Sequence, residues 1–555
     1  MNLFANESGL LIGILTYLGI IGFTIILFRK TAFAFVALSL TYGIIGLSVY
    51  WNLEIREFLL LFLVYILPGQ LINVLFYAAP LLFEQNTSTQ PSYKVRLAHR
   101  TGKLTLQNIR RGVSVIGSAG SGKTESIVYR LIEHFYKNNF CGVIHDYKNY
   151  EITELAYPLY KAKKMLKEGE KVETKQEPDE KFKKPAFHII SFDKIHKRVN
   201  PIAPHYLPDE ESVNEVSRVL LENLLEHQDT NLRGSSRFFN DAVEGLLGGL
   251  MWKLKTEHPN FCTLPHLIAT YQHLDPLTLI DWLSSDVTSR AMADAFISGR
   301  DSERQTAGVL STLANALKKI STQRIFMALS ADDIPLDINN PAHPAVVSIV
   351  NNPKFETAYS PIVATILHTI IKQMSLRDKR PSFVLMEEAP TIRLLNMHRI
   401  PATLRSYDIA TIYVLQDKAQ NDLMYGEKAS RAILSNLSYQ FFGKSNDPET
   451  SRYYEQFFEL VKRPTKSVSK AADFFKSETR VTRGEREVSK IRSDAFFRLR
   501  QGEFIAFADG KDRRIHFPKP KLIRSLPNPK YIHEKGDFEA NFNNVHAQVR
   551  ILFKG

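Results

Sequence analysis

One stretch of the chain reads Gly117-Ser118-Ala119-Gly120-Ser121-Gly122-Lys123-Thr124 and matches the phosphate-binding P-loop pattern G-x-x-x-x-G-K-[ST]. Its three glycines let backbone N–H groups turn inward around phosphate oxygens. The pattern predicts that Lys123 reaches the β- and γ-phosphates and that Thr124 offers its hydroxyl to Mg²⁺. We therefore predict that residues 117–124 bind ATP together with Mg²⁺.

The residues around this loop have the context that a P-loop needs. Residues 113–116 alternate as a short buried strand, and residues 125–136 are typical of a helix whose N-terminus adds positive potential. A second strand at residues 141–146 places Asp146 and Lys148 at its carboxyl end, where α/β sheets bind their ligands. The pattern predicts an α/β domain with a nucleotide at this edge of the sheet.

An acidic pair further along the chain supplies the usual partner of a P-loop. The apolar strand at residues 381–386 is followed directly by Glu387 and Glu388. We assign Glu387 to the Mg²⁺ shell together with Thr124, and Glu388 to the attacking water. Aspartate is usual at the metal position, so Glu387 is a departure, which a bridging water would accommodate.

Residues 410–415 form another apolar strand, which ends in Gln416. In P-loop motors a polar residue at this place senses the γ-phosphate, so Lys123, Glu388 and Gln416 form the predicted catalytic set. The alternative is that Gln416 only caps the strand.

The first 85 residues differ from the rest in hydropathy. Three uncharged stretches occupy residues 10–28, 31–52 and 58–83, and each is long enough to cross about 30 Å of hydrocarbon as a helix. No basic segment precedes the first stretch, so it does not have the form of a secretory signal. We predict a transmembrane region over residues 1–85 with three crossings. Because Pro68 interrupts the third stretch, two crossings are the alternative.

Charges in the links between these stretches predict the orientation. Arg29 and Lys30 lie in the first link, whereas the second link, near Glu54, is net acidic. Basic links stay on the inner side of a membrane. This predicts an outside N-terminus and a cytoplasmic body.

The composition narrows the classes of protein. The chain of 555 residues has 71 Lys and Arg against 58 Asp and Glu, a net charge of +13. Three basic and four acidic residues lie in the first 85, so the body carries +14, which favours anionic partners such as nucleic acid or lipid head groups. Two cysteines, Cys141 and Cys262, exclude a disulfide scaffold and a four-cysteine zinc site. No G-x-S-x-G or H-E-x-x-H motif supports a hydrolase or zinc function.

Between the P-loop and the acidic pair the pattern becomes helical. From residue 208 to residue 329, apolar residues recur at three- and four-residue spacing, as in residues 237–252 and 301–319. These stripes predict core packing, and we expect no cofactor there.

Two charged stretches, residues 161–184 and 462–492, are predicted to be surface loops. The second contains Arg480, Arg483 and Arg486, and it either lines a DNA path or is only solvated. The segment after Pro518 is predicted to be a short, proline-spaced tail.

Several motifs together resemble the type IV secretion coupling proteins, the TraD and TraG type of conjugation ATPase. They are, in chain order, Val199-Asn-Pro201, Phe383-Val-Leu-Met-Glu-Glu-Ala-Pro390, Leu404-Arg-Ser-Tyr407, Val414-Leu-Gln-Asp-Lys-Ala-Gln420, Tyr425-Gly-Glu-Lys-Ala429 and Phe442-Gly-Lys-Ser-Asn-Asp-Pro-Glu-Thr450. The resemblance covers about residues 90–515 and is densest at 380–455. Glu387 departs from the family pattern, as does Asn149, where the family often has glycine.

The resemblance implies a RecA-like P-loop NTPase domain of the α/β class, with an inserted all-α domain that selects substrate. The implied boundaries are 1–85 for the transmembrane region, 86–207 and 330–530 for the NTPase domain, 208–329 for the all-α insertion and 531–555 for the tail. The family also implies a homohexamer in the bacterial inner membrane, with a neighbour's arginine completing each nucleotide site. Arg405, Arg431 and Arg452 are the candidates for that arginine.

The function favoured by the resemblance is an ATP-driven motor that recruits DNA, or a DNA–relaxase complex, and passes it to a type IV secretion channel during conjugation. One alternative is a receptor ATPase for protein effector substrates. Another is a membrane scaffold whose ATPase activity has lapsed at Glu387.

Overall fold

A computed structural model of this protein describes residues 92–161, 183–225, 234–470, 479–528 and 532–553. The chain divides into two units, residues 1–90 and 91–555, and the described residues all belong to the second. The three predicted membrane spans therefore lie outside the described residues. Within the described part, no helix is both long and apolar enough to cross a membrane.

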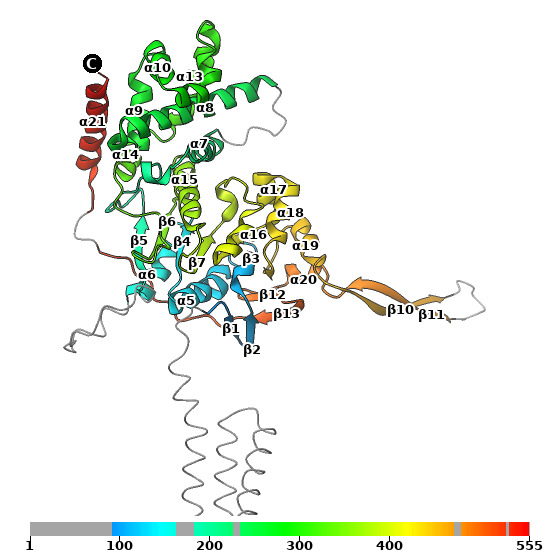
Figure 1. Cartoon of the computed structure of the whole chain (residues 1–555). Coiled ribbons are helices and arrows are strands. Elements are labelled where there is room, and N and C mark those ends of the chain that lie inside the picture. The colour runs from blue at the N-terminus through cyan, green and yellow to red at the C-terminus, as the bar shows by residue number, and fades with distance from the viewer. Residues whose placement is uncertain (1–91, 162–182, 226–233, 471–478, 529–531, 554–555) are drawn as a thin grey trace, which may run out of the picture. The chain divides into compact units, whose positions relative to one another are not determined.

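A nine-stranded sheet forms the centre of the second unit (Figure 1), with the strand order β13-β12-β9-β3-β8-β7-β4-β6-β5. The strands from β9 to β5 run parallel, and β12 and β13 add an antiparallel edge. Their bounds are β3 (Val113–Ile116), β4 (Cys141–Asp146), β5 (Ala186–Ile190), β6 (Ala345–Val350), β7 (Ser382–Met386), β8 (Ile409–Leu415), β9 (Tyr439–Phe442), β12 (Glu503–Ala508) and β13 (Lys511–His516).

Both faces of the sheet are covered, so its central strands are apolar on both sides. In β7, Phe383 and Leu385 belong to a core that includes α5 (Tyr129–Lys137), whereas Val384 and Met386 belong to a core that includes α15 (Glu356–Met374). The aromatic rings of Phe383 and Phe135, which lies in α5, stack with centroids 4.3 Å apart. This two-sided burial explains why the strands are continuous apolar runs in the sequence. Smaller elements complete this part: the hairpin β1 (Val95–His99) and β2 (Gly102–Leu106), and α6 (Thr153–Lys161).

Residues 208–329 contain only helices among their described residues. The bounds are α7 (Glu210–Leu224), α8 (Gly234–Glu257), α9 (Leu264–His273), α10 (Pro276–Ser284), α11 (Val287–Met292), α12 (Asp294–Ile297), α13 (Glu303–Lys318) and α14 (Gln323–Leu329). Five of them begin after an Asp or Thr whose side chain accepts a backbone N–H of the first turn, the usual way to start a helix: Asp209, Thr263, Asp275, Asp286 and Thr322.

The chain leaves and re-enters the sheet domain at neighbouring points. Val199, before the helical region, donates its N–H to the oxygen of Ala328 in the last helix, α14, at 2.8 Å, and Asp333, after that region, donates its N–H to Arg198 O at 3.1 Å. The buried Asn200 side chain donates to Cys262 O at 2.9 Å, so the Asn-Pro element anchors the start of this region to its interior. The helical region is therefore inserted in the sheet domain.

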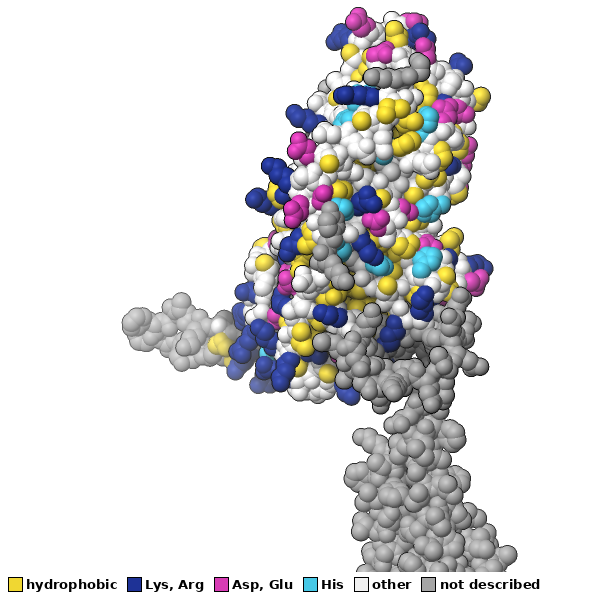
Figure 2. All heavy atoms as spheres, turned by 90° about the vertical axis from the view of Figure 1, so that its left-hand side faces the viewer, with side chains coloured by type: hydrophobic (Ala, Val, Ile, Leu, Met, Phe, Trp, Pro, Cys, Tyr) yellow, Lys and Arg dark blue, Asp and Glu magenta, His cyan; other side chains and the backbone are white. Residues whose placement is uncertain are grey.

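The end of the chain differs from the expected short tail, because it contains the helix α21 (Lys535–Leu552). This helix packs on α9 and α14 of the helical region, with Phe538, Val545 and Val549 buried. Figure 2 views the face that carries α21, where basic, acidic and histidine side chains are interspersed. These three buried positions form only a narrow apolar stripe among polar residues. The prolines that precede the helix favour an irregular tail, so the sequence does not predict it.

The basic stretch at residues 462–492 also differs from the surface loop that the sequence predicts. β10 (Leu460–Lys470) and β11 (Thr479–Ser489) pair antiparallel over eleven residues each and form a two-stranded ribbon. The ribbon extends from the body beyond α19 (Pro448–Glu455) and α20 (Asp494–Phe497) (Figure 1). Several β-branched Val and Thr residues in both segments favour strands, but no apolar alternation marks them, because both faces of the ribbon are exposed.

Candidate nucleotide-binding site

Four neighbouring strands bring the predicted site residues to one edge of the sheet. β3 leads into the P-loop, β8 ends before Gln416, β7 ends before Glu387, and β4 ends shortly before Lys148. These strands are adjacent and parallel in the order β3-β8-β7-β4. Because parallel strands present their carboxyl ends at the same edge, side chains far apart in sequence converge there.

The P-loop is held by backbone contacts and by two glycines. Ser118 N–H donates to Lys444 O at 2.7 Å, which ties the loop to the segment after β9. Gly120 and Gly122 have φ of +74° and +88°, in the left-handed region that glycine adopts without strain. The loop leads into a π-helical turn, η3 (Thr124–Val128), which continues as α5. The helix start therefore points its N–H groups at the loop, as anion sites require.

The side chain of Lys123 lies inside this loop and is buried. Its Nζ donates to Gly117 O at 2.5 Å and lies 3.4 Å from Ser118 O. Burial lowers the pKa of Lys123, an effect that the Glu388 carboxylate opposes. A buried ammonium whose hydrogen-bond partners are carbonyl groups fits an anionic ligand in the loop.

Glu387 and Glu388 are 1% and 2% exposed, and three of their four carboxylate oxygens lack a hydrogen-bond donor among the described residues. Neither side-chain oxygen of Glu387 has a hydrogen-bond partner among the described residues, nor does Oε2 of Glu388. Burial raises the pKa of Glu387 above its usual range, and the Asp146 carboxylate adds to this. Buried polar atoms are normally paired, so these three oxygens fit a bound cation or water.

The backbone at Glu388 is strained, which marks it as a special position. Its φ is +44° and its ψ is 52°, a left-handed conformation that glutamate rarely adopts. The turn ends β7 and begins the short helix η8 (Ala389–Thr391). Strain of this kind is concentrated at functional sites.

Glu388 receives donors from both neighbouring strand ends. Lys148 Nζ lies 2.8 Å from Glu388 Oε1, and Gln416 Nε2 donates to the same oxygen at 3.1 Å. Lys148 Nζ also lies 3.6 Å from Glu387 Oε1. Burial opposes the charge on Lys148, but the two carboxylates outweigh it and raise its pKa. The sequence alone places Lys148 at a strand end without a partner, because it does not determine that β4 and β7 are adjacent.

Asp146 and His145 end β4 and are buried beside the acidic pair, where the backbone oxygen of His145 accepts the N–H of Glu387 at 3.1 Å. Asp146 Oδ2 accepts from Thr153 N–H at 2.7 Å and from the Thr153 hydroxyl at 2.5 Å, which fastens β4 to α6. His145 is completely buried, and burial lowers its pKa to about 4, so the ring is neutral. Asp146 Oδ1 and both ring nitrogens of His145 are buried without a hydrogen-bond partner among the described residues.

The metal-binding capacity of this edge depends on a ligand. Thr124 is the first residue of η3, directly after Lys123. Within the described ranges, no group of three or more His, Cys, Asp or Glu side chains is arranged to hold a metal ion. A Mg²⁺ ion held by Thr124 and Glu387 would therefore need phosphate oxygens and water to complete its octahedral shell, as is usual in nucleotide sites.

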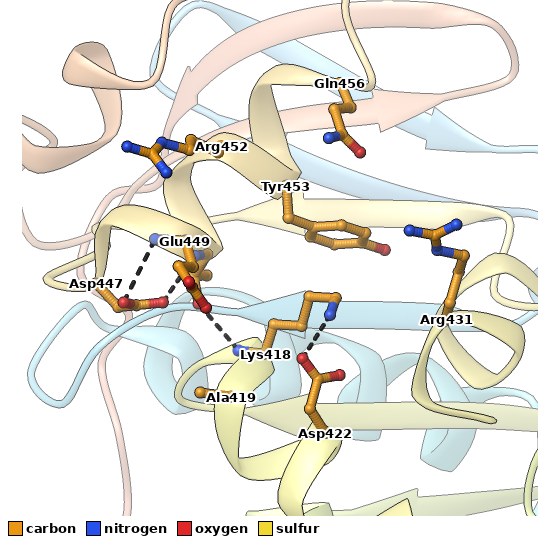
Figure 3. Close-up of a pocket in the computed structure, with 10 residues that line it drawn as sticks. Lys418, Ala419, Asp422, Arg431, Asp447, Glu449, Arg452, Tyr453 and Gln456 are labelled. Atoms are coloured by element: carbon orange, nitrogen blue, oxygen red, sulfur yellow. Dashed lines mark hydrogen bonds and ion pairs between the residues drawn. The ribbon is translucent and has the colours of Figure 1, made fainter. Parts of the chain in front are cut away.

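A separate pocket of about 240 Å³ lies between α17 (Lys418–Tyr425), α18 (Glu427–Ser435) and α19 (Figure 3). Lys418 N–H donates to the Thr450 hydroxyl at 3.1 Å, and Asp447 accepts from Thr450 N–H at 2.7 Å. The Asn-Asp-Pro-x-Thr motif is thus a helix cap that also ties α19 to α17.

Two of the three candidate arginines line this pocket. Arg431 and Arg452 are seen at different sides of it in Figure 3, and neither forms an ion pair with the described residues. Arg405 begins the short helix η9 (Arg405–Tyr407) and is not among the residues that line the pocket. The structure thus separates Arg405 from the other two.

One protein family matches part of the chain. Residues 381–486 match the family model described as "TraM recognition site of TraD and TraG". This segment carries β7, β8, the acidic pair, Gln416 and most of the ribbon. No curated protein sequence matches the chain.

Solved structures share the fold. The bacterial conjugative coupling protein TrwBdeltaN70, unbound, aligns with a TM-score of 0.57 at 12% identity, over 78% of this chain and 90% of that one. TrwB with a non-hydrolysable ATP analogue aligns with a TM-score of 0.56 at 12% identity, over 75% of this chain and 87% of that one. TrwB with ADP and Mg²⁺ aligns with a TM-score of 0.54 at 12% identity, over 75% of this chain and 88% of that one. Together with the family match, this likeness confirms the predicted resemblance to coupling proteins of the TraD and TraG type.

Proposed function

We propose that this chain is an ATP-hydrolysing coupling protein of bacterial conjugation, which recruits DNA or a DNA–relaxase complex and passes it to a type IV secretion channel. The observation that carries the ATPase part is the convergence of Lys148, Glu388 and Gln416 beside the P-loop, with three buried carboxylate oxygens left without donors. The complexes of TrwB with an ATP analogue and with ADP and Mg²⁺ support the choice of nucleotide and metal.

Each residue at the edge then has a distinct role. The P-loop backbone and Lys123 hold the β- and γ-phosphates, and Thr124 and Glu387 hold Mg²⁺, which when bound withdraws charge from the phosphate oxygens. Glu388 orients the attacking water, and the ammonium of Lys148, 2.8 Å from its Oε1, holds the carboxylate in position.

Gln416 is proposed to couple the γ-phosphate to this carboxylate. Its side chain reaches Glu388 Oε1, while the residue before it, Leu415, accepts the N–H of Gly117 at 3.2 Å. A shift of the P-loop against β8 would therefore change the position of Glu388. The capping alternative is less favoured, because Gln416 bonds to a functional carboxylate.

The membrane and assembly parts of the proposal rest on the sequence. We propose that residues 1–85 anchor the chain in the bacterial inner membrane in two or three crossings, with a cytoplasmic body that works as a homohexamer. A neighbour's Arg431 or Arg452 would complete each site, since both line one pocket without ion-pair partners among the described residues. Labelling from outside of a cysteine placed at Ser118 would overturn this topology.

ATP hydrolysis by the purified full-length protein, with and without duplex DNA, tests the function. We expect Mg²⁺-dependent hydrolysis that rises with DNA and with protein concentration. Absence of hydrolysis would favour the lapsed scaffold. Hydrolysis without DNA binding at low salt would favour the receptor for protein substrates, a candidate that the description of the matched family as a recognition site for TraM also supports.

A further inference from the structure

The ribbon of β10 and β11 has two unlike faces. Residues that pair across an antiparallel ribbon point to the same face, and successive residues alternate between faces. We call one side the arginine face, and its pairs are Val461–Val488, Arg463–Arg486, Thr465–Gly484 and Ser467–Thr482. We call the other side the mixed face, and its pairs are Leu460–Ser489, Lys462–Glu487, Pro464–Glu485, Lys466–Arg483 and Val468–Val481.

Acidic residues are present on only one of these faces, the mixed face, where they partly offset three basic residues that include the opposed pair Lys466–Arg483. Both acidic residues of the described ribbon, Glu485 and Glu487, lie on the mixed face, where Lys462 Nζ is 3.9 Å from Glu485 Oε2. On the arginine face, Arg463 stands directly opposite Arg486, with no acidic residue among the pairs just named. Like charges directly opposite each other destabilise a ribbon, so this pair indicates a function outside the folding of the ribbon itself.

We propose that the arginine face binds the sugar–phosphate backbone of duplex DNA. The positions beyond the arginines carry small side chains, Thr465, Gly484, Ser467 and Thr482, which let a backbone approach closely. Eleven residues of strand span about 36 Å, close to one turn of B-DNA. A two-stranded ribbon also fits the major groove, which is about 12 Å wide. The acidic residues of the mixed face would repel phosphates, so the ribbon would turn its arginine face toward the DNA.

Single-stranded DNA and a protein partner fit the arginine face less well than duplex DNA does. Neither strand contains an aromatic residue, whereas single-strand binders use aromatic rings as stacking platforms and protein interfaces use them as anchors. The matched family, which covers β10 and most of β11, is described as a recognition site for a protein. Single strands and a protein partner are therefore the alternatives that the experiment must separate from duplex DNA.

The inference deepens the proposed function, because it names the surface through which a coupling protein would contact DNA. Binding is measured without nucleotide, so a protein that fails to hydrolyse ATP still gives a readable result. Two double variants of the full-length protein in detergent are compared, R463Q/R486Q and K466Q/R483Q. Each removes two positive charges from the ribbon, so they differ only in the face that changes.

The assay is the fluorescence anisotropy of a 30-base-pair duplex, in two unrelated sequences, over a salt series. In R463Q/R486Q we expect the slope of log affinity against log salt to flatten by about 1.8 and low-salt affinity to fall roughly tenfold, for both sequences alike. In K466Q/R483Q we expect less than a third of this loss. Unchanged DNA-free ATP hydrolysis or thermal unfolding shows that both variants are folded.

Several outcomes would overturn the proposal. Wild-type duplex affinity in R463Q/R486Q would place the DNA elsewhere. Equal losses of duplex affinity in both variants would indicate that the DNA responds to the overall positive charge of the ribbon and not to the arginine face. Loss of binding to a 30-nucleotide single strand, with duplex binding intact, would assign the arginine face to single strands. Intact binding of all DNA with loss of a purified relaxosome protein would assign it to a protein partner.

Discussion

The nucleotide edge of the sheet and the ribbon differ in how their charges are paired. At the sheet edge Lys148 forms an ion pair with the buried Glu388, whereas on the ribbon Arg463 lies opposite Arg486 in solvent. At the sheet edge, each charge has a counter-charge or a hydrogen-bond partner nearby, and burial shifts the pKa of Lys123 down and that of Glu387 up. On the arginine face of the ribbon, Arg463 and Arg486 stand opposite each other with no acidic residue among the described pairs of that face. Compensated, buried charge is typical of a preorganised catalytic site. Uncompensated, exposed charge indicates a partner outside the chain.

The largest expected effect is at the buried lysine of the P-loop, Lys123. We expect Lys123→Ala to lower ATP hydrolysis about a thousandfold, because the residue supplies charge inside the loop that no neighbour replaces. The matched control is Lys444→Ala, which removes an exposed lysine whose backbone oxygen already contacts the loop at Ser118. We expect that control to stay within about twofold of wild type, since screened surface charges contribute little.

Steady-state turnover with Mg²⁺-ATP, together with thermal unfolding, measures both variants. If Lys123→Ala kept more than a tenth of wild-type turnover, the P-loop lysine would not be the residue that stabilises the transferred phosphoryl group. If Lys444→Ala fell as far, burial would not be what distinguishes the two lysines.

The second effect separates the two carboxylates. We expect Glu388→Gln to bind nucleotide normally but to turn over about a hundredfold more slowly, because the attacking water loses its orienting group. Glu387→Gln should instead weaken the dependence of nucleotide binding on Mg²⁺. Fluorescent-nucleotide titrations with and without Mg²⁺, beside turnover, measure this. Full turnover in Glu388→Gln with loss in Glu387→Gln would reverse the assigned roles.

The elements that carry the site could be predicted closely from the sequence. The expected strands at 113–116 and 141–146 coincide with β3 and β4. Each is a short apolar run between turns, and burial on both faces makes such runs conspicuous. The sequence alone is therefore enough to predict that the P-loop and the acidic pair each follow a strand of one sheet.

Two kinds of feature could not be predicted. The contact of Lys148 with Glu388 depends on the order of parallel strands, which long connections leave open in a single sequence. The sequence predicts a loop at the ribbon because neither face of the ribbon is buried, so the strands lack the period-two apolar signal. Local patterns thus indicate elements that pack on a core, and they fail where an element is exposed on both sides.

A third, smaller effect concerns how Glu388 is held in place. We expect Lys148→Gln to lower turnover about tenfold, because Glu388 Oε1 would lose its charged donor and keep only Gln416, so the buried carboxylate would orient the water less firmly. Steady-state turnover measures this, and Lys148→Arg should restore it in part. Unchanged turnover in Lys148→Gln would show that Lys148 only fills space. The exposed Arg463, changed to Gln, should leave DNA-free turnover unchanged.

The smallest effect concerns the pair His273 and His546, which is less buried than the nucleotide edge, less exposed than the ribbon, and able to change its charge with pH. His273 Nε2 and His546 Nδ1 lie 3.0 Å apart where α21 packs on α9, so one ring must donate and the other accept. Burial lowers the pKa of both rings, and Arg550 adds to this for each. Both are therefore neutral in the folded protein, and their contribution to docking is present above about pH 6.5 and is lost as the pH falls.

We accordingly expect α21 to open more often in acid, by about three- to tenfold between pH 7.5 and pH 5.5. Hydrogen exchange of residues 535–552, corrected for the intrinsic rate at each pH, measures this. His546→Gln keeps a polar partner that cannot become charged, so its opening should lose most of the pH dependence. His266 is the internal control: its Nε2 lies 3.0 Å from Gln548 Oε1, a contact that a protonated ring still satisfies, so His266→Gln should retain the wild-type dependence. If His546→Gln opened in acid as wild type does, the charge of this pair would not hold α21, and its docking would depend on the buried Phe538, Val545 and Val549.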